Sequence, residues 1–137
     1  MLKGQIVRKC LSTGEPVGSY CMIIGFKGYH SNLVHLETVD GVVKSYVKRD
    51  RIKVLKSVKL IIGHKTFERI QKGLQTAIIH DASPKWIDIW KKEPEIIQLR
   101  DELYQERTMV FPVENLEKLL YHRYETVVRL ELGVRII

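Results

Sequence analysis

The sequence contains few cysteines and no long apolar segment. Cys10 and Cys21 are its only cysteines, so a disulfide framework and a cysteine-rich zinc site are both excluded. No stretch approaches 18 uninterrupted apolar residues, which excludes a membrane-spanning helix. We therefore expect no membrane among the partners of this protein. Residues 1–5 lack the apolar segment of a secretory signal, so we expect a cytoplasmic protein with reduced thiols.

The positive charge is concentrated in the first part of the chain. The 137 residues carry a formal net charge of +7, with 45% hydrophobic and 28% charged residues, as in ordinary globular proteins. Residues 1–56 hold ten Lys and Arg against four Asp and Glu, whereas residues 57–137 hold thirteen against twelve. A basic module attracts polyanions such as nucleic acid. The alternative is that the excess charge only keeps a small protein soluble.

Residues 1–56 have the pattern of a small antiparallel β-barrel. Short segments rich in β-branched and aromatic residues alternate with glycines, and Asp40-Gly41 is a hairpin signal between two of them. The predicted strands are 17–26, 33–39, 42–47 and 52–55. In strand number and spacing the segment resembles a Src homology 3-type barrel, in which a tight turn near 48–51 would precede the last strand.

Residues 57–137 predict a mixed α+β domain, joined to the barrel without a flexible linker. We predict strands at 58–62, 75–80, 108–111 and 124–132 from the alternation of apolar and polar residues. Thr66 is expected to cap a helix over 66–71 with Gly73 at its C′ position, and Ser83 a helix that begins at Pro84. Helical spacing of apolar residues predicts two more helices, over 95–105 and 113–121.

One segment of the second domain resembles a known family. Phe67, Ile70, Gly73 and Thr76 have the spacing found at the start of ASCH domains, which belong to the PUA-like superfamily. The resemblance covers residues 66–80 and implies a small β-barrel with flanking helices and a cleft for RNA or modified nucleosides. Some members hydrolyse amide bonds on modified bases with a lysine, a threonine and an acid. Here Leu74 and Gln75 replace the usual lysines and His80 replaces an arginine, which puts that activity in doubt.

The densest basic feature is the expected nucleic-acid site. Basic side chains beside an aromatic ring can bind phosphates and stack a base. Alternatively, they are solvated strand faces that protect an exposed sheet edge from pairing. A second candidate is the loop at 25–30, where glycines flank Phe26 and Tyr29; these rings are either exposed for a base or part of the core and hairpin rim. The residues of the main site are Lys44, Tyr46, Lys48, Arg49, Arg51 and Lys53.

A catalytic site is a further hypothesis. His64, Lys65, Thr76 and His80 follow or flank predicted strands, and they would form an acid–base pocket if those strands were neighbours. Under the alternative, Asp81 or Ser83 caps the next helix and His80 only ends a strand. No two histidines have metal-ligand spacing on one element, so we expect neither a metal nor another cofactor.

The sequence therefore favours a non-enzymatic nucleic-acid-binding protein, RNA in preference to DNA, that contacts mainly phosphates. Two other readings stay open. One is a protein-interaction module that uses Tyr20, Tyr29 and Tyr46 as an aromatic face. The other is a hydrolase acting on a nucleoside or nucleic acid. Trp86 and Trp90, four residues apart, are expected to anchor their helix to a sheet, or else to form a partner surface.

Overall fold

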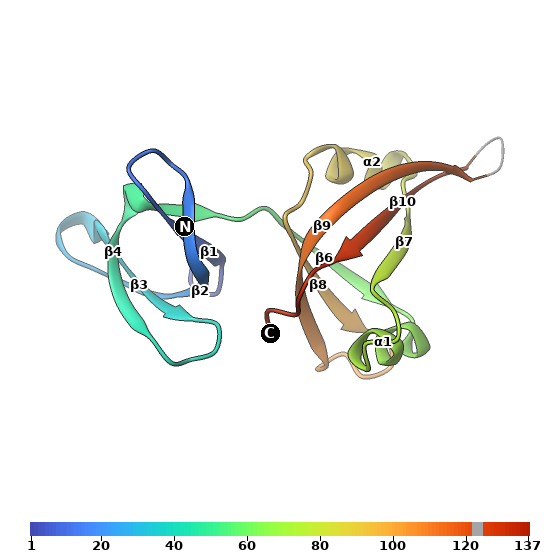
Figure 1. Cartoon of the computed structure of the whole chain (residues 1–137), viewed down its shortest axis with the longest axis horizontal. Coiled ribbons are helices and arrows are strands. Elements are labelled where there is room, and N and C mark those ends of the chain that lie inside the picture. The colour runs from blue at the N-terminus through green and yellow to red at the C-terminus, as the bar shows by residue number, and fades with distance from the viewer. Residues whose placement is uncertain (122–124) are drawn as a thin grey trace. The chain divides into compact units, whose positions relative to one another are not determined.

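The computed structural model describes residues 1–121 and 125–137, and the chain forms two compact units (Figure 1). Unit 1 comprises Met1–Leu55 and unit 2 comprises Lys56–Ile137. The division therefore falls one residue before the predicted boundary between residues 56 and 57.

Unit 1 is a five-stranded antiparallel sheet in the order β4-β3-β2-β1-β5. Single 3₁₀ turns, η1 and η2, precede β3 and β5. The elements of unit 1 are β1 Ile6–Cys10, β2 Pro16–Lys27, η1 Tyr29–Ser31, β3 Leu33–Thr38, β4 Lys44–Lys48, η2 Arg49–Arg51 and β5 Ile52–Val54.

The two-residue period of these strands places one face of the sheet in a common core. Val7, Cys21, Ile23, Val34 and Leu36 are buried together. Four half-buried side chains pack against them: Phe26, Val47, Ile52 and Val54. Because all five strands contribute to one cluster, the sheet curls around it (Figure 1). The barrel-like, β-rich character predicted for this segment is confirmed.

The hairpin signal at Asp40-Gly41 is also confirmed, because it joins β3 to β4. The Asp40 Oδ1 atom accepts hydrogen bonds from the Thr38 hydroxyl at 2.6 Å and from the Val42 N–H at 3.0 Å. Gly41 has φ +77°, a left-handed conformation that favours glycine. These bonds lower the pKa of Asp40 below its usual value.

Unit 2 is a mixed sheet with two helices, in the order β6-β8-β9-β10-β7. β6 and β8 are parallel, and the other pairs are antiparallel. The elements are β6 Ser57–Ile62, α1 His64–Gln71, β7 Ala77–Asp81, α2 Pro84–Lys91, β8 Ile96–Asp101, β9 Thr108–Tyr121 and β10 Glu125–Leu132. The predicted α+β class is confirmed.

The strand predictions from alternation hold, but the capping predictions hold only in part. Val58, Leu60 and Ile62 are buried in β6, and β10 buries Val128, Leu130 and Leu132. Tyr124, the first residue of the predicted last strand, lies outside the described residues.

Helix α1 begins at His64 after Gly63, so Thr66 lies inside the helix and does not cap it. The end was predicted correctly, since Gly73 has φ +75° and the Leu74 N–H donates to the Arg69 carbonyl. Ser83 does precede α2, with Pro84 at the first helical position, but its hydroxyl makes no capping bond. The chain that the structure describes contains no helix of the length and apolarity needed to cross a membrane.

The predicted helices at 95–105 and 113–121 are wrong. Residues 96–101 form β8, and 108–121 form the continuous strand β9. The helical spacing was coincidental, because β8 buries Ile96, Ile97 and Leu99 on both faces of a central strand. β9 pairs with β8 through residues 108–112 and with β10 through residues 113–121, and this pairing fixes it as a strand.

The core of unit 2 lies between the sheet and the two helices. α1 contributes Phe67 and Ile70, and α2 contributes Trp90, which is 1% exposed. The Trp90 Nε1–H donates to the Asp81 carbonyl at 2.9 Å, so the buried indole has its polar partner. Trp86 is half-buried against the same core. Anchoring of α2 by tryptophan is therefore confirmed.

Leu99→Ala should destabilise unit 2 by about 2–5 kcal/mol, because it leaves a cavity in a fully buried site. Ile61→Ala, at a 61% exposed position of the neighbouring strand, is the control and should change little. Both tryptophans lie in α2, so tryptophan fluorescence during urea unfolding reports on unit 2. Equal unfolding midpoints for the two variants would contradict this core assignment.

Candidate nucleic-acid interface

Three of the predicted site residues share one face of β4. Along this strand Lys44, Tyr46 and Lys48 are exposed, while Ser45 and Val47 are partly buried. The alternation arises because Val47 faces the core of unit 1. β4 is also an edge strand of its sheet. The structure therefore places an exposed ring between two exposed lysines at these three positions.

Strand pairing brings two further residues to Tyr46. His35 on β3 pairs with Tyr46 in register, and their rings stack with centroids 4.4 Å apart and planes 16° apart. The Lys27 ammonium, from the end of β2, lies 5.1 Å from the Tyr46 ring centroid, within cation–π range. We call Lys27, His35, Lys44, Tyr46 and Lys48 the Tyr46 patch. Tyr46 itself remains 50% exposed.

The Tyr46 patch contains three lysines that form no ion pair among the described residues. In the part of the chain that the structure describes, no carboxylate lies within ion-pair distance of Lys27, Lys44 or Lys48. Glu37 pairs with Lys44 in the β3–β4 register and is the nearest acidic residue by strand position. Cations without carboxylate partners are available to an incoming anion.

The other predicted phosphate contacts are distributed elsewhere on unit 1. Arg49 donates its Nε–H to the Ser31 carbonyl at 2.7 Å and lies 5.1 Å from the Phe26 ring centroid, so its side chain fastens η1. Arg51 is exposed in η2. Lys53 lies on β5, at the other edge of the sheet, opposite Arg8 of β1. The six residues predicted from sequence therefore lie on three consecutive elements, β4, η2 and β5.

In the aromatic loop at 25–30, one ring packs against the core and the other is exposed. Phe26 packs against the core of unit 1, as the structural alternative predicted. Tyr29 is 82% exposed in η1, where its ring contacts only that of His30 among the residues described, at a centroid distance of 4.1 Å. His30 and Ser31 have φ +52° and +54°, a strained conformation for non-glycine residues.

The four catalytic candidates belong to different parts of unit 2. β6 and β7 are the two edge strands of the sheet, so the neighbouring arrangement on which the acid–base pocket depended is not formed. His64 and Lys65 open α1, and Thr76 precedes β7. His80, near the far end of β7, packs its ring against Trp86 and Trp90 at 4.6 and 5.4 Å.

A buried carboxylate beside His64 was missed by sequence analysis. Asp101 ends β8 and is fully buried. Its Oδ2 accepts a hydrogen bond from His64 Nδ1 at 2.7 Å, and its Oδ1 accepts one from the Leu103 N–H at 2.9 Å. His64 Nε2 lies 3.2 Å from a Glu68 carboxylate oxygen. Only the parallel pairing of β6 and β8, which aligns Ile62 with Asp101, reveals this contact.

The contacts in this cluster link His64 to two carboxylates, those of Asp101 and Glu68. Both nitrogens of His64 face carboxylates, and no hydroxyl or thiol hydrogen-bonds to it among the residues described. Burial tends to raise the pKa of Asp101, but the Leu103 N–H and the His64 hydrogen bond and charge hold it below its ordinary value. The pair therefore ties the loop after β8 to the start of α1.

The cysteines and histidines do not gather into a ligand set. Cys10 and Cys21 are both free thiols, and burial raises the pKa of Cys21. Within residues 1–121 and 125–137, no three His, Cys, Asp or Glu side chains are placed to hold a metal ion. His122, one of the five histidines, lies outside the described residues.

The lowered pKa of Asp101 predicts a pH dependence for unit 2. Its stabilising contribution is complete above the unfolded-state pKa of about 3.9 and is lost as pH falls through the lower folded-state pKa. Asp101→Asn should lower the urea concentration at the unfolding midpoint near neutral pH. As the pH is lowered, this midpoint should decrease less in the variant than in the unaltered chain. Asp88→Asn, an exposed change of the same charge on α2, is the control. Identical pH curves for Asp101→Asn and the unaltered chain would contradict the assignment.

Comparison with known proteins gives no relative for this chain. No protein-family model matches it, and searches of curated proteins and of solved structures also find no match.

Proposed function

We propose that this protein binds single-stranded nucleic acid through the Tyr46 patch of unit 1. The observation that carries the proposal is the half-exposed Tyr46 ring, placed between Lys44 and Lys48 on an edge strand, with Lys27 beside it. A half-exposed ring can stack a base, and flanking ammonium groups bind the phosphates on either side of it.

The spacing along β4 suits a strand laid lengthwise. Alternate residues of a β-strand are about 6.6–6.8 Å apart, so Lys44 and Lys48 reach phosphates on both sides of a base at Tyr46. Lys27 is held over the ring only by a flexible stem, so its ammonium can move to a phosphate when a base takes its place. Edge strands often carry lysines to prevent aggregation, but that purpose requires neither the stacked His35 nor a half-exposed aromatic ring.

RNA is the expected polymer on the ASCH-like resemblance of residues 66–80, and the binding mode at Tyr46 accommodates either nucleic acid. The protein-interaction alternative is less well supported, because its three rings do not form a common face. Tyr20 lies under Arg8, Tyr29 is in η1 and Tyr46 is on β4, with no ring contact among them in unit 1. For the hydrolase alternative, its four candidate residues are not gathered at one site.

Removing Lys44 and Lys48 together should weaken binding and reduce its salt dependence. Each single-strand phosphate contact contributes about 0.7 to the slope of log K against log salt, so Lys44→Ala with Lys48→Ala should lower the slope by about 1.4. Fluorescence anisotropy of labelled RNA and DNA strands of about 12 nucleotides, titrated at several KCl concentrations, measures it. Lys72→Ala with Lys118→Ala, two exposed lysines of unit 2, is the charge-matched control. An unchanged slope in the β4 variant would refute the proposal.

Tyr46→Ala should weaken binding by about 1–3 kcal/mol while leaving the salt slope unchanged, because stacking releases no counterions. The same titration measures both quantities. Tyr104→Ala, a similarly exposed tyrosine of unit 2, should have no effect. Arg49 is left intact in both experiments because its side chain holds η1. Equal affinities for Tyr46→Ala and the unaltered chain would show that no base stacks there.

A further inference from the structure

Unit 2 contains a pocket between the start of β6 and helix α2, with a volume of about 460 Å³. This volume lies within the range of small-molecule sites. Its apolar surface comes from Val58, Trp86, Ile89 and Pro94. The remaining lining residues are Lys56, Ser57, Lys59 and Lys92, so none of the eight is acidic.

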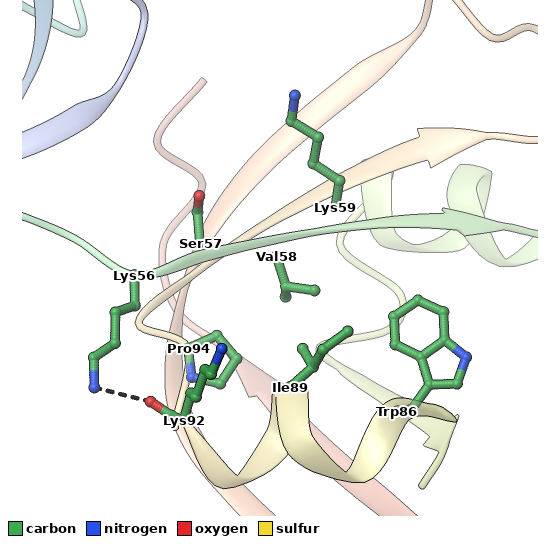
Figure 2. Close-up of a pocket in the computed structure, with 8 residues that line it drawn as sticks. All are labelled: Lys56, Ser57, Val58, Lys59, Trp86, Ile89, Lys92 and Pro94. Atoms are coloured by element: carbon green, nitrogen blue, oxygen red, sulfur yellow. Dashed lines mark hydrogen bonds between the residues drawn. The ribbon is translucent and has the colours of Figure 1, made fainter. Parts of the chain in front are cut away.

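The pocket has an aromatic end and a cationic end. Figure 2 shows Val58 and Ile89 facing one another across it, Trp86 at one end, and Lys56 and Lys92 at the other. Lys59 extends from the opposite side of β6 to Val58, so its ammonium points away from the apolar surface (Figure 2). A ligand that fits this arrangement has a flat ring at one end and an anionic group at the other.

The two lysines at the cationic end differ in availability. The Lys56 ammonium donates a hydrogen bond to the Lys92 carbonyl oxygen at 2.8 Å, which satisfies the end of α2. The backbone N–H of Lys56 donates to the Glu95 side-chain carboxylate at 3.0 Å. Across the described residues, the Lys92 ammonium has no carboxylate within ion-pair distance. Lys92 is therefore the cation that an anionic ligand would engage.

We infer that this pocket binds a nucleotide, with the base against Trp86 and the phosphate on Lys92. The choice of a nucleotide among ring-bearing anions rests on the proposed nucleic-acid function. Trp86 is well suited to stacking because it is half-buried and held by His80 and Trp90, with ring centroids 4.6 and 6.0 Å away. Both a free nucleotide and a nucleotide unit of a bound strand have this chemistry.

Calorimetry on the full chain tests the inference with adenosine monophosphate, adenosine and inorganic phosphate as separate probes. The monophosphate should bind more tightly than either fragment, because only it reaches both ends of the pocket. Lys92→Ala should weaken it about tenfold, as expected for one hydrogen bond between charged groups, and Lys92→Glu should weaken it further. Lys91→Ala and Lys91→Glu, at the adjacent exposed position of α2 outside the lining, are matched controls.

Circular dichroism of each variant shows whether α2 remains folded. Monophosphate binding no tighter than that of adenosine, or equal losses for the Lys91 and Lys92 variants, would overturn the inference.

Competition with a labelled strand distinguishes the two sources of nucleotide. If the pocket holds part of a strand, the monophosphate displaces the strand and Lys92→Ala weakens strand binding as well. If it holds a free nucleotide, the monophosphate binds without displacing the strand. Strand binding that depends on Tyr46, in a protein that binds no monophosphate, would overturn this inference and leave the proposed function intact. Monophosphate binding that needs Lys92, in a protein that binds no strand, would overturn the proposed function and leave the monophosphate site in unit 2 intact.

Discussion

The alternation of side chains along β-strands is the constraint on which both the fold and the candidate interface depend. In unit 1, Val47 must face the buried cluster, so Lys44, Tyr46 and Lys48 are placed together on the outside of β4. A shift of one residue in the β3–β4 register would turn the lysines and the tyrosine towards the core. The Asp40-Gly41 turn fixes that register through the bonds of Asp40 with Thr38 and Val42. The turn that forms the hairpin thus also sets which face of β4 presents the Tyr46 ring to solvent.

The two units combine cationic and aromatic groups in different ways. The Tyr46 patch is an open surface on an edge strand, where the ring is stacked on His35 and flanked by lysines. The pocket of unit 2 is a partly open hollow in which Trp86 and Lys92 lie at opposite ends. An open patch suits a polymer that extends beyond the site, whereas a concave pocket of this volume suits a single unit of limited size. The two proposals therefore concern different ligands or different parts of one ligand.

Asp101 shows how a polar group can be buried to organise a loop. Its carboxylate is fully buried, and both oxygens accept hydrogen bonds, one from His64 and one from the Leu103 N–H. Such a group is tolerated only because its partners replace the water that it loses. The contact joins the end of β8 to the start of α1, which are adjacent only because β6 and β8 run parallel. His64 is consequently held by two carboxylates, which gives the residue a structural role.

The amino-acid sequence by itself determined the features that depend on local spacing. These include four of the five strands of the basic segment (all but β1), the turn at Asp40-Gly41, the alternation in β6 and β10 and the beginning of α2 at Pro84, because turn chemistry and side-chain period depend on neighbouring residues. Only the tertiary structure decided that residues 96–101 and 113–121 are strands, since their apolar spacing also matches a helix and pairing with neighbouring strands selects the extended form. It likewise decided which side chains lie together: Lys27 and His35 join Tyr46 from separate strands, whereas Lys53 lies on the strand at the opposite edge of the sheet. Hydrogen bonds between strands distant in sequence set these neighbours, and no local pattern encodes them.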